Sequence, residues 1–173
     1  PQGADILLIE STYADRDHPS SDDVKGRLKG LIEDIHQLNS PLIIPAFNEG
    51  TLLPSTLTRV CAYMGTLEAQ YRWEIIVVND GSSDDTAEVA DDFAKTRREI
   101  RIVHHHRNRG LGQALRTGFQ SSLGRYVVVL DCDLSYAPEH VGRLLDQIER
   151  TQATIVVASP YADGGLVSHV PWL

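Results

Sequence analysis

Short apolar runs alternate with longer amphipathic segments along most of the chain. In segment 138–150, four apolar residues recur at helical spacing and so share one face. Alternation of this length predicts βαβ units, and therefore an α/β fold with a mostly parallel sheet and helices on both faces. The predicted strands are Ile6–Ile9, Leu42–Ile44, Ile75–Val78, Ile100–Val103, Tyr126–Leu130 and Ile155–Val157, and the predicted helices are 24–38, 54–68, 85–97, 111–122 and 138–150.

Two carboxylates follow the most apolar of these strands. The apolar run Tyr126–Leu130 predicts a strand buried on both faces. Asp131 and Asp133 come directly after it. In extended backbone, residues two apart point the same way, so the two carboxylates would repel each other. A divalent cation such as Mg²⁺ or Mn²⁺, which takes oxygen ligands and bridges to phosphates, would relieve that repulsion. The alternative is that both aspartates cap the following turn.

Composition narrows the class of protein. The chain has 173 residues, of which 42% are hydrophobic, enough for one domain with a core. A net charge of -8 argues against general nucleic-acid binding, which needs a basic face. No apolar run approaches the ~20 residues of a membrane-spanning helix. Cys61 and Cys132 lie far apart, and we expect free thiols in a reducing compartment.

Three more loops behind predicted strands carry polar or turn-forming residues. Pro45–Glu49 follows one strand, and Asn79–Thr86 follows the next. In the second loop, helix capping explains Asp84, Asp85 and Thr86 better than it explains Asp80, whose carboxylate could bind a ribose or base. The third loop, Asn108–Gly118, supplies glycines at a helix start, where backbone N–H groups can meet phosphate.

Two conspicuous features receive plain structural interpretations. Consecutive side chains at a strand end point in different directions, so we expect His104, His105 and His106 to be solvated loop residues rather than a metal cluster. Cys132 lies between the two aspartates, and we expect it to face the opposite side as a small buried hydrophobic residue.

The loops and their order resemble glycosyltransferase family 2, in particular its dolichol-phosphate mannosyltransferase-like branch. The resemblance covers about residues 41–165. It implies a GT-A fold, here C-terminally truncated, and an enzyme that moves a sugar from a nucleoside-diphosphate sugar to an acceptor such as a lipid phosphate, with inversion. The matching strings are PLIIPAFNEG, WEIIVVNDGSSDDT, NRGLGQALRTGFQ, GRYVVVLDCDLSYAPEHV and, more weakly, ASPYADGG.

The resemblance also implies a donor site. Asp131 and Asp133 would form the D-x-D signature that holds Mg²⁺ or Mn²⁺ against the donor diphosphate. Asp80 would contact the base or ribose. The enzyme would work in the cytoplasm or at the cytoplasmic membrane face, where donor sugars are made. The remaining residues that would line the base and ribose site are Pro45, Ala46, Phe47 and Glu49.

Departures from the family pattern leave a second function open. Ser135 stands where the branch often carries glutamine, and Pro160 stands where an arginine often meets the diphosphate. We also expect the acceptor half of the domain to be missing, which leaves the catalytic residues unknown. The alternative is therefore a truncated or fused, non-catalytic nucleotide-sugar-binding remnant.

The first forty residues form a separate segment by their motifs. Residues 4–47 resemble a β-CASP metallo-β-lactamase-fold hydrolase segment, in which Glu10 would match an acidic position. The H-x-H-x-D-H zinc cluster that the hydrolase chemistry needs is absent from the sequence. A fragment of a zinc-dependent hydrolase is therefore a distant third hypothesis for the function. We expect 1–40 to be a foreign leader before a family 2 domain at 41–173. Its strand Ile6–Ile9 would dock at a sheet edge or be poorly ordered, and would not pair with Leu42–Ile44.

Overall fold

The computed structural model describes residues 5–9 and 40–159. All six predicted strands are confirmed, and their ends differ from the prediction by at most two residues. Four of the five predicted helices are also confirmed, while the fifth, 24–38, lies outside the described residues. The strands are β1 (Asp5–Ile9), β2 (Ser40–Ala46), β3 (Trp73–Asn79), β4 (Ile100–His104), β5 (Tyr126–Val129) and β6 (Ile155–Ala158), and the helices are α2 (Leu53–Thr66), α3 (Thr86–Thr96), α4 (Leu111–Ser121) and α5 (Glu139–Thr151).

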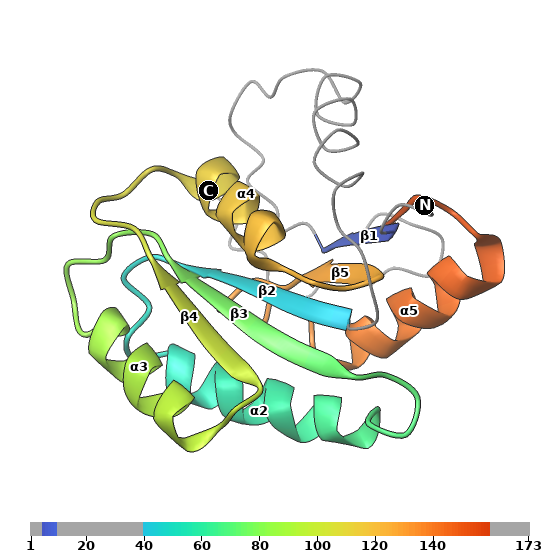
Figure 1. The fold of residues 1–173 in the computed structure, drawn as a ribbon, viewed down its shortest axis with the longest axis horizontal. Coiled ribbons are helices and arrows are strands. Elements are labelled where there is room, and N and C mark those ends of the chain that lie inside the picture. Colours follow the sequence, from blue (N-terminus) through green and yellow to red (C-terminus); the bar gives the residue numbers. More distant parts are fainter. Residues whose placement is uncertain (1–4, 10–39, 160–173) are drawn as a thin grey trace, which may run out of the picture.

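The six strands form one parallel sheet in the order β4-β3-β2-β5-β1-β6 (Figure 1). From β2 the chain adds β3 and then β4 on one side, and later places β5 on the other side of β2. This reversal makes the β2/β5 boundary a topological switch point. In open α/β sheets, ligands bind in the crevice outside the carboxyl ends of the strands at such a point.

Helices cover both faces of the sheet, as the alternating pattern predicts. Helices α2 and α5 pack with alternate residues of β2, β3 and β5, and Ala90 of α3 joins the same cluster. On the opposite face α4 packs through Ala114 and Phe119 against Ile43, Ile76 and other inward-facing strand residues. The central strands β2 and β5 are therefore buried on both sides, which explains their continuous apolar runs.

Strand β1 takes a position that the sequence did not predict. It pairs with β5, where Ile6 stands beside Val127, and with β6, where Ile6 stands beside Ile155. As predicted, it does not pair with β2, but its placement at a sheet edge was wrong. The crossover through α5 skips one strand position between β5 and β6, and β1 fills that gap. There its backbone bonds to both neighbours, which satisfies polar groups that face each other across the gap.

Gly118 sets how closely α4 approaches the sheet. A Cβ atom at this position would lie 2.5 Å from Cγ2 of Ile43, which is fully buried and cannot move aside. Replacing Gly118 with alanine should therefore destabilise the protein by about 1–3 kcal/mol through overpacking. Denaturant unfolding would measure the change.

Gly112→Ala is the matched control, because it lies in the same helix and no atom lies within 4 Å of its added Cβ. That variant should be neutral or stabilised by up to about 1 kcal/mol through helix propensity. Equal effects of the two substitutions would contradict the close approach of α4 to β2.

Candidate functional site

Backbone hydrogen bonds join neighbouring strand ends at the edge where the carboxyl ends meet. The Asp80 N–H donates to the Ala46 carbonyl (2.9 Å), and the His105 N–H donates to the Asn79 carbonyl (2.9 Å). Closer to the switch point, the Leu130 N–H donates to the Ile43 carbonyl (3.0 Å). The loops that carry the predicted site residues therefore start from fixed backbone positions.

The loop after β2 is held against the loop after β3 by reciprocal hydrogen bonds. The Asn48 N–H donates to the Ser82 hydroxyl (2.9 Å), and the Ser83 N–H donates to the Asn48 side-chain carbonyl (2.9 Å). The Glu49 N–H donates to the Thr86 hydroxyl (2.8 Å). Asn48 has φ 56°, a left-handed conformation that asparagine tolerates better than most residues.

Asp84 confirms the capping interpretation and also extends it, whereas Asp85, the N-cap residue of α3, makes no side-chain capping hydrogen bond. The Asp84 carboxylate accepts hydrogen bonds from the backbone N–H (3.0 Å) and the hydroxyl of Thr86, and from the Gly50 N–H (3.1 Å). The hydrogen bond from the Thr86 hydroxyl is the largest cause that lowers the pKa of Asp84. Asp84 thus caps α3 and fixes the loop after β2 at the same time.

The predicted residues Pro45–Glu49 present different groups at the site. The Ala46 side chain is buried, and its backbone carbonyl accepts the hydrogen bond from the Asp80 N–H. The Phe47 ring is 45% exposed and free to stack on a flat ligand. Pro45 and Glu49 are half-buried. Whether these side chains contact a nucleotide stays a prediction.

Glu49 connects the two sides of the switch point electrostatically. Its pKa is raised, first by burial and then by the negative charges of Asp133 and Asp84. Asp133 belongs to the loop after β5 and Asp84 to the loop after β3, so three loops bring carboxylates toward one region. Such a concentration of negative charge favours a bound cation.

Asp131 and Asp133 lie in a turn rather than in extended backbone. Strand β5 ends at Val129, the Leu134 N–H donates to the Asp131 carbonyl (3.2 Å), and Leu134 has φ 53°. The premise that strand geometry aligns the two carboxylates was therefore wrong, because the chain turns before the second one. Asp131 is half-buried and Asp133 is exposed.

Ser135 orients the exposed carboxylate. Its N–H donates to one oxygen of Asp133 and its hydroxyl donates to the other, both at 2.8 Å. Each carboxylate oxygen keeps a further lone pair for a cation. The residue that departs from the family pattern thus holds the second aspartate of the D-x-D signature in place.

Cys132 anchors this turn from the buried side, as predicted. Its side chain is buried, and burial is the first cause that raises the pKa of its thiol to about 12. Its carbonyl accepts a hydrogen bond from the buried Thr56 hydroxyl (2.5 Å), which ties the turn to α2. A thiol with so high a pKa is protonated at neutral pH, which agrees with a small buried hydrophobic residue.

The buried carboxylate of Asp80 organises the loop between β4 and α4. It accepts hydrogen bonds from the Gly110 N–H (2.7 Å) and the Arg109 N–H (3.0 and 3.1 Å), and it contacts Nδ1 of His105 at 2.5 Å. The other ring nitrogen of His105 lies 2.8 Å from the Thr117 hydroxyl. Asp80, His105 and Thr117 therefore form a continuous polar network beneath this loop.

This network corrects two sequence-based expectations. The His105 side chain is only 6% exposed, so it is not a solvated loop residue as predicted. The Arg109 and Gly110 N–H groups already donate to the Asp80 carboxylate. They lie at the start of the segment that we expected to meet phosphate. The sequence missed His105 and Thr117 because neither stands in a recognisable motif. The sequence signal that could have pointed to them was Asp80, a strand-end aspartate that needs hydrogen-bond donors from other loops once it is buried.

The carboxylates fit a divalent cation that is completed by its substrate. Among residues 5–9 and 40–159, no group of three or more histidine, cysteine, aspartate or glutamate side chains could hold a metal by itself. Two aspartates with Glu49 nearby offer hard oxygen ligands in a negative field. That arrangement suits Mg²⁺ or Mn²⁺, which bind through one or two carboxylates plus substrate phosphates.

The fold and the loop arrangement define a class of α/β protein, the GT-A fold. A mannosyltransferase from Pyrobaculum calidifontis, solved in complex with GDP-Man and Mn²⁺, superimposes with a TM-score of 0.54 at 23% identity, over 72% of this chain and 39% of that one. At this level of identity the likeness shows the GT-A fold alone.

Sequence comparison then shows the family. The family model for glycosyl transferase family 2 matches residues 42–172. The chain is 36% identical to polyprenol monophosphomannose synthase from Mycolicibacterium smegmatis over 135 residues, which is 76% of this chain and 48% of the relative. This chain belongs to glycosyltransferase family 2, a family of enzymes.

A second group of relatives acts on a different sugar. Undecaprenyl-phosphate 4-deoxy-4-formamido-L-arabinose transferase from Pectobacterium carotovorum is 38% identical over 117 residues, or 67% of this chain and 35% of the relative. The chain thus spans half or less of the curated relatives it matches. These matches give no support to the β-CASP resemblance of residues 4–47. No helix within the described part of the chain is long and apolar enough to cross a membrane.

Removing the negative charge of Asp80 tests its organising role. Asp80→Asn should destabilise the protein by about 1–3 kcal/mol, because an amide presents one acceptor oxygen to donors that now share two. It should also increase hydrogen exchange at the Arg109 and Gly110 amides. Asp85→Asn, at an exposed position without a side-chain capping bond, should change neither quantity. Equal exchange in both variants would contradict the role of Asp80.

Glu49 should carry a stability cost at neutral pH. A raised pKa means that the folded state favours the protonated form, so the favourable contribution is complete below about pH 4.5 and is lost as the pH rises through the shifted pKa. Glu49→Gln should therefore stabilise the metal-free protein at pH 7 by on the order of 0.5 kcal/mol, a figure reduced for solvent screening. The gain should disappear at pH 4 in thermal unfolding. A gain that is independent of pH would exclude like-charge repulsion as its cause.

Proposed function

We propose that this chain binds the donor of an inverting, metal-dependent glycosyltransferase. The donor is a nucleoside-diphosphate sugar, and the acceptor is a lipid phosphate such as a polyprenyl phosphate. Family membership supports the general class of reaction. The two relatives described above carry names that specify polyprenol- and undecaprenyl-linked products, which supports the acceptor class for this chain.

One observation carries the proposal. The pKa of Glu49, from the loop after β2, is raised first by burial and then by the negative charge of Asp133, from the loop after β5. These loops flank the topological switch point, where ligands of open α/β sheets bind. A cation beside Asp133 would relieve the repulsion that the protein otherwise carries there.

The predicted residues divide between the two ends of the donor. Pro45, the exposed Phe47 ring and Glu49 would hold the base and ribose, and the Ala46 carbonyl fixes the loop beneath them. Asp80 would contribute to the same end. Its carboxylate already binds the loop after β4, so a contact with the nucleotide would have to use its remaining lone pairs.

Asp131 and Asp133 would hold Mg²⁺ or Mn²⁺ at the diphosphate end. The ion, when bound, supplies Lewis acidity that stabilises charge developing on the departing nucleoside diphosphate. Ser135 keeps the Asp133 carboxylate oriented toward solvent, where a diphosphate can approach it.

We further propose that residues 1–40 are a leader distinct from the family 2 domain at 41–173. The start of the family match at residue 42 supports this division. Strand β1 nevertheless contributes to the sheet between β5 and β6. A protein that uses a lipid-phosphate acceptor and a donor made in the cytoplasm would work at the cytoplasmic membrane face.

Donor binding can be measured by calorimetry with UDP- and GDP-sugars, with and without Mn²⁺. We expect one nucleotide class to bind with Mn²⁺ and to weaken at least tenfold with chelator or in Asp133→Asn, because each removes the link to the diphosphate. Asp146→Asn is the matched control, since it makes the same chemical change at an exposed position of α5. No binding of any donor, or binding indifferent to both changes, would refute the proposed site.

A second candidate function is a non-catalytic nucleotide-sugar-binding module. Its support is two departures from the family pattern, Ser135 where the branch often carries glutamine and Pro160 where an arginine often meets the diphosphate. Transfer of labelled sugar to a short-chain polyprenyl phosphate separates the two functions. Metal-dependent donor binding with no transfer would favour the binding module, and transfer would exclude it.

A further inference from the structure

A basic segment stands out in an otherwise acidic protein. The chain carries a net charge of -8, yet residues 97–109 contain five arginines, three histidines and Glu99 as their only acid. Strand β4 divides this segment. Arg97 and Arg98 precede the strand, whereas Arg107 and Arg109 follow it, at the edge where the site loops lie.

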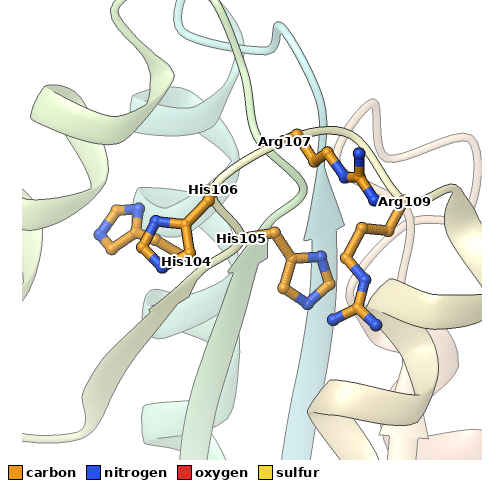
Figure 2. A pocket seen from close by; sticks show the side chains of 5 residues that line it. All are labelled: His104, His105, His106, Arg107 and Arg109. Carbon is orange, nitrogen blue, oxygen red and sulfur yellow. The ribbon is translucent and has the colours of Figure 1, made fainter.

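The residues after β4 line a pocket of about 310 Å³ (Figure 2). Figure 2 shows the Arg107, Arg109 and His105 side chains extending to one side of the loop, and those of His104 and His106 to the other. Within residues 40–159 neither arginine forms an ion pair, while His105 is paired with Asp80. The five residues that line the pocket are His104, His105, His106, Arg107 and Arg109.

The backbone that carries the two arginines is fixed in advance. Asp80 binds the Arg109 and Gly110 N–H groups, and His105 is held between Asp80 and Thr117. Gly81, with φ 68°, packs directly beneath the backbone of Arg107, and any side chain there would collide with it. A fixed backbone presents both arginine side chains on the same side of the loop and loses little conformational freedom on binding.

The pocket is separate from the candidate metal site. In the order β4-β3-β2-β5, three interstrand spacings lie between the end of β4 and the end of β5, which bears Asp131 and Asp133. At about 4.8 Å each, these spacings amount to roughly 14 Å. A diphosphate on the metal at β5 would therefore not fill the pocket beside β4.

We propose that this pocket binds a phosphate group other than the donor diphosphate. Arginine forms bidentate hydrogen bonds with phosphate oxygens, and an anion between Arg107 and Arg109 would offset the repulsion of two uncompensated charges. The phosphate belongs either to a lipid headgroup or to a free ion. Leu111, two residues after Arg109, is 53% exposed and could contact the apolar part of a lipid.

Binding of two probes tests the proposal, without Mn²⁺ or nucleotide. The probes are inorganic phosphate, followed by amide chemical shifts, and phosphatidylglycerol vesicles, followed by co-sedimentation against phosphatidylcholine vesicles. In Arg107→Gln/Arg109→Gln we expect phosphate shifts to be lost. Affinity for anionic vesicles, where present, should fall about 30-fold, since each arginine near such a surface contributes roughly a fivefold factor.

Arg97→Gln/Arg98→Gln is the matched control, because it removes the same charge from exposed positions at the opposite sheet edge. It should retain phosphate binding. Binding of both probes identifies a lipid headgroup, and binding of phosphate alone identifies a free ion. No binding of either probe, or equal losses in the two double variants, would overturn the proposal.

A third variant separates this pocket from the candidate metal site. Asp133→Asn should leave phosphate binding unchanged if the pocket is independent of the candidate metal site. Loss of phosphate binding in that variant would place the anion at the donor site and would also overturn the proposal. Because the assay uses neither metal nor nucleotide, its result does not depend on the proposed transferase function.

Discussion

The parallel direction of all six strands is the constraint on which the rest of this structure depends. It brings every carboxyl end to one edge, so loops far apart in sequence become neighbours there. The reversal of strand order between β2 and β5 then brings together the loops that carry Glu49 and Asp133, and the charge of Asp133 adds to the burial that raises the pKa of Glu49. We propose that the donor binds where these two loops meet.

Polar side chains, rather than apolar packing, fix the loops at this edge. Asp84 joins the loop after β2 to the start of α3, Ser135 orients Asp133, and Asp80 holds the loop that leads into α4. In each case a carboxylate accepts N–H groups that would otherwise lack partners near a helix or strand end. The protein thus uses acidic residues both to build the edge and, we propose, to bind a metal there.

Local elements could be predicted from the sequence because their apolar periodicity is strong. The strand ends at Ala46, Asn79 and Val129 lie within two residues of the points where the apolar runs were predicted to stop. The turn at Leu134 could not be predicted, since its left-handed conformation breaks the spacing rule that was applied to Asp131 and Asp133. Such turns depend on local hydrogen bonds that a hydrophobic pattern does not record.

Contacts between residues far apart in the sequence also could not be predicted. The contact of Asp80 with His105 joins residues 25 apart in sequence, and nothing in either motif specifies it. The position of β1 depends on which sheet gap needs a partner, a property of the assembled fold rather than of residues 5–9. The family resemblance named candidate site residues, which stay predictions, and it did not describe the hydrogen bonds that hold them.

Paramagnetic broadening by Mn²⁺ in the presence of the bound nucleoside diphosphate tests the central claim most directly. We expect amide resonances of residues 131–135 to broaden first and those of 47–50 next, while resonances of 97–99 at the opposite edge stay sharp. Broadening centred on any other part of the chain, or none at stoichiometric Mn²⁺, would contradict a donor site at the β2/β5 switch point.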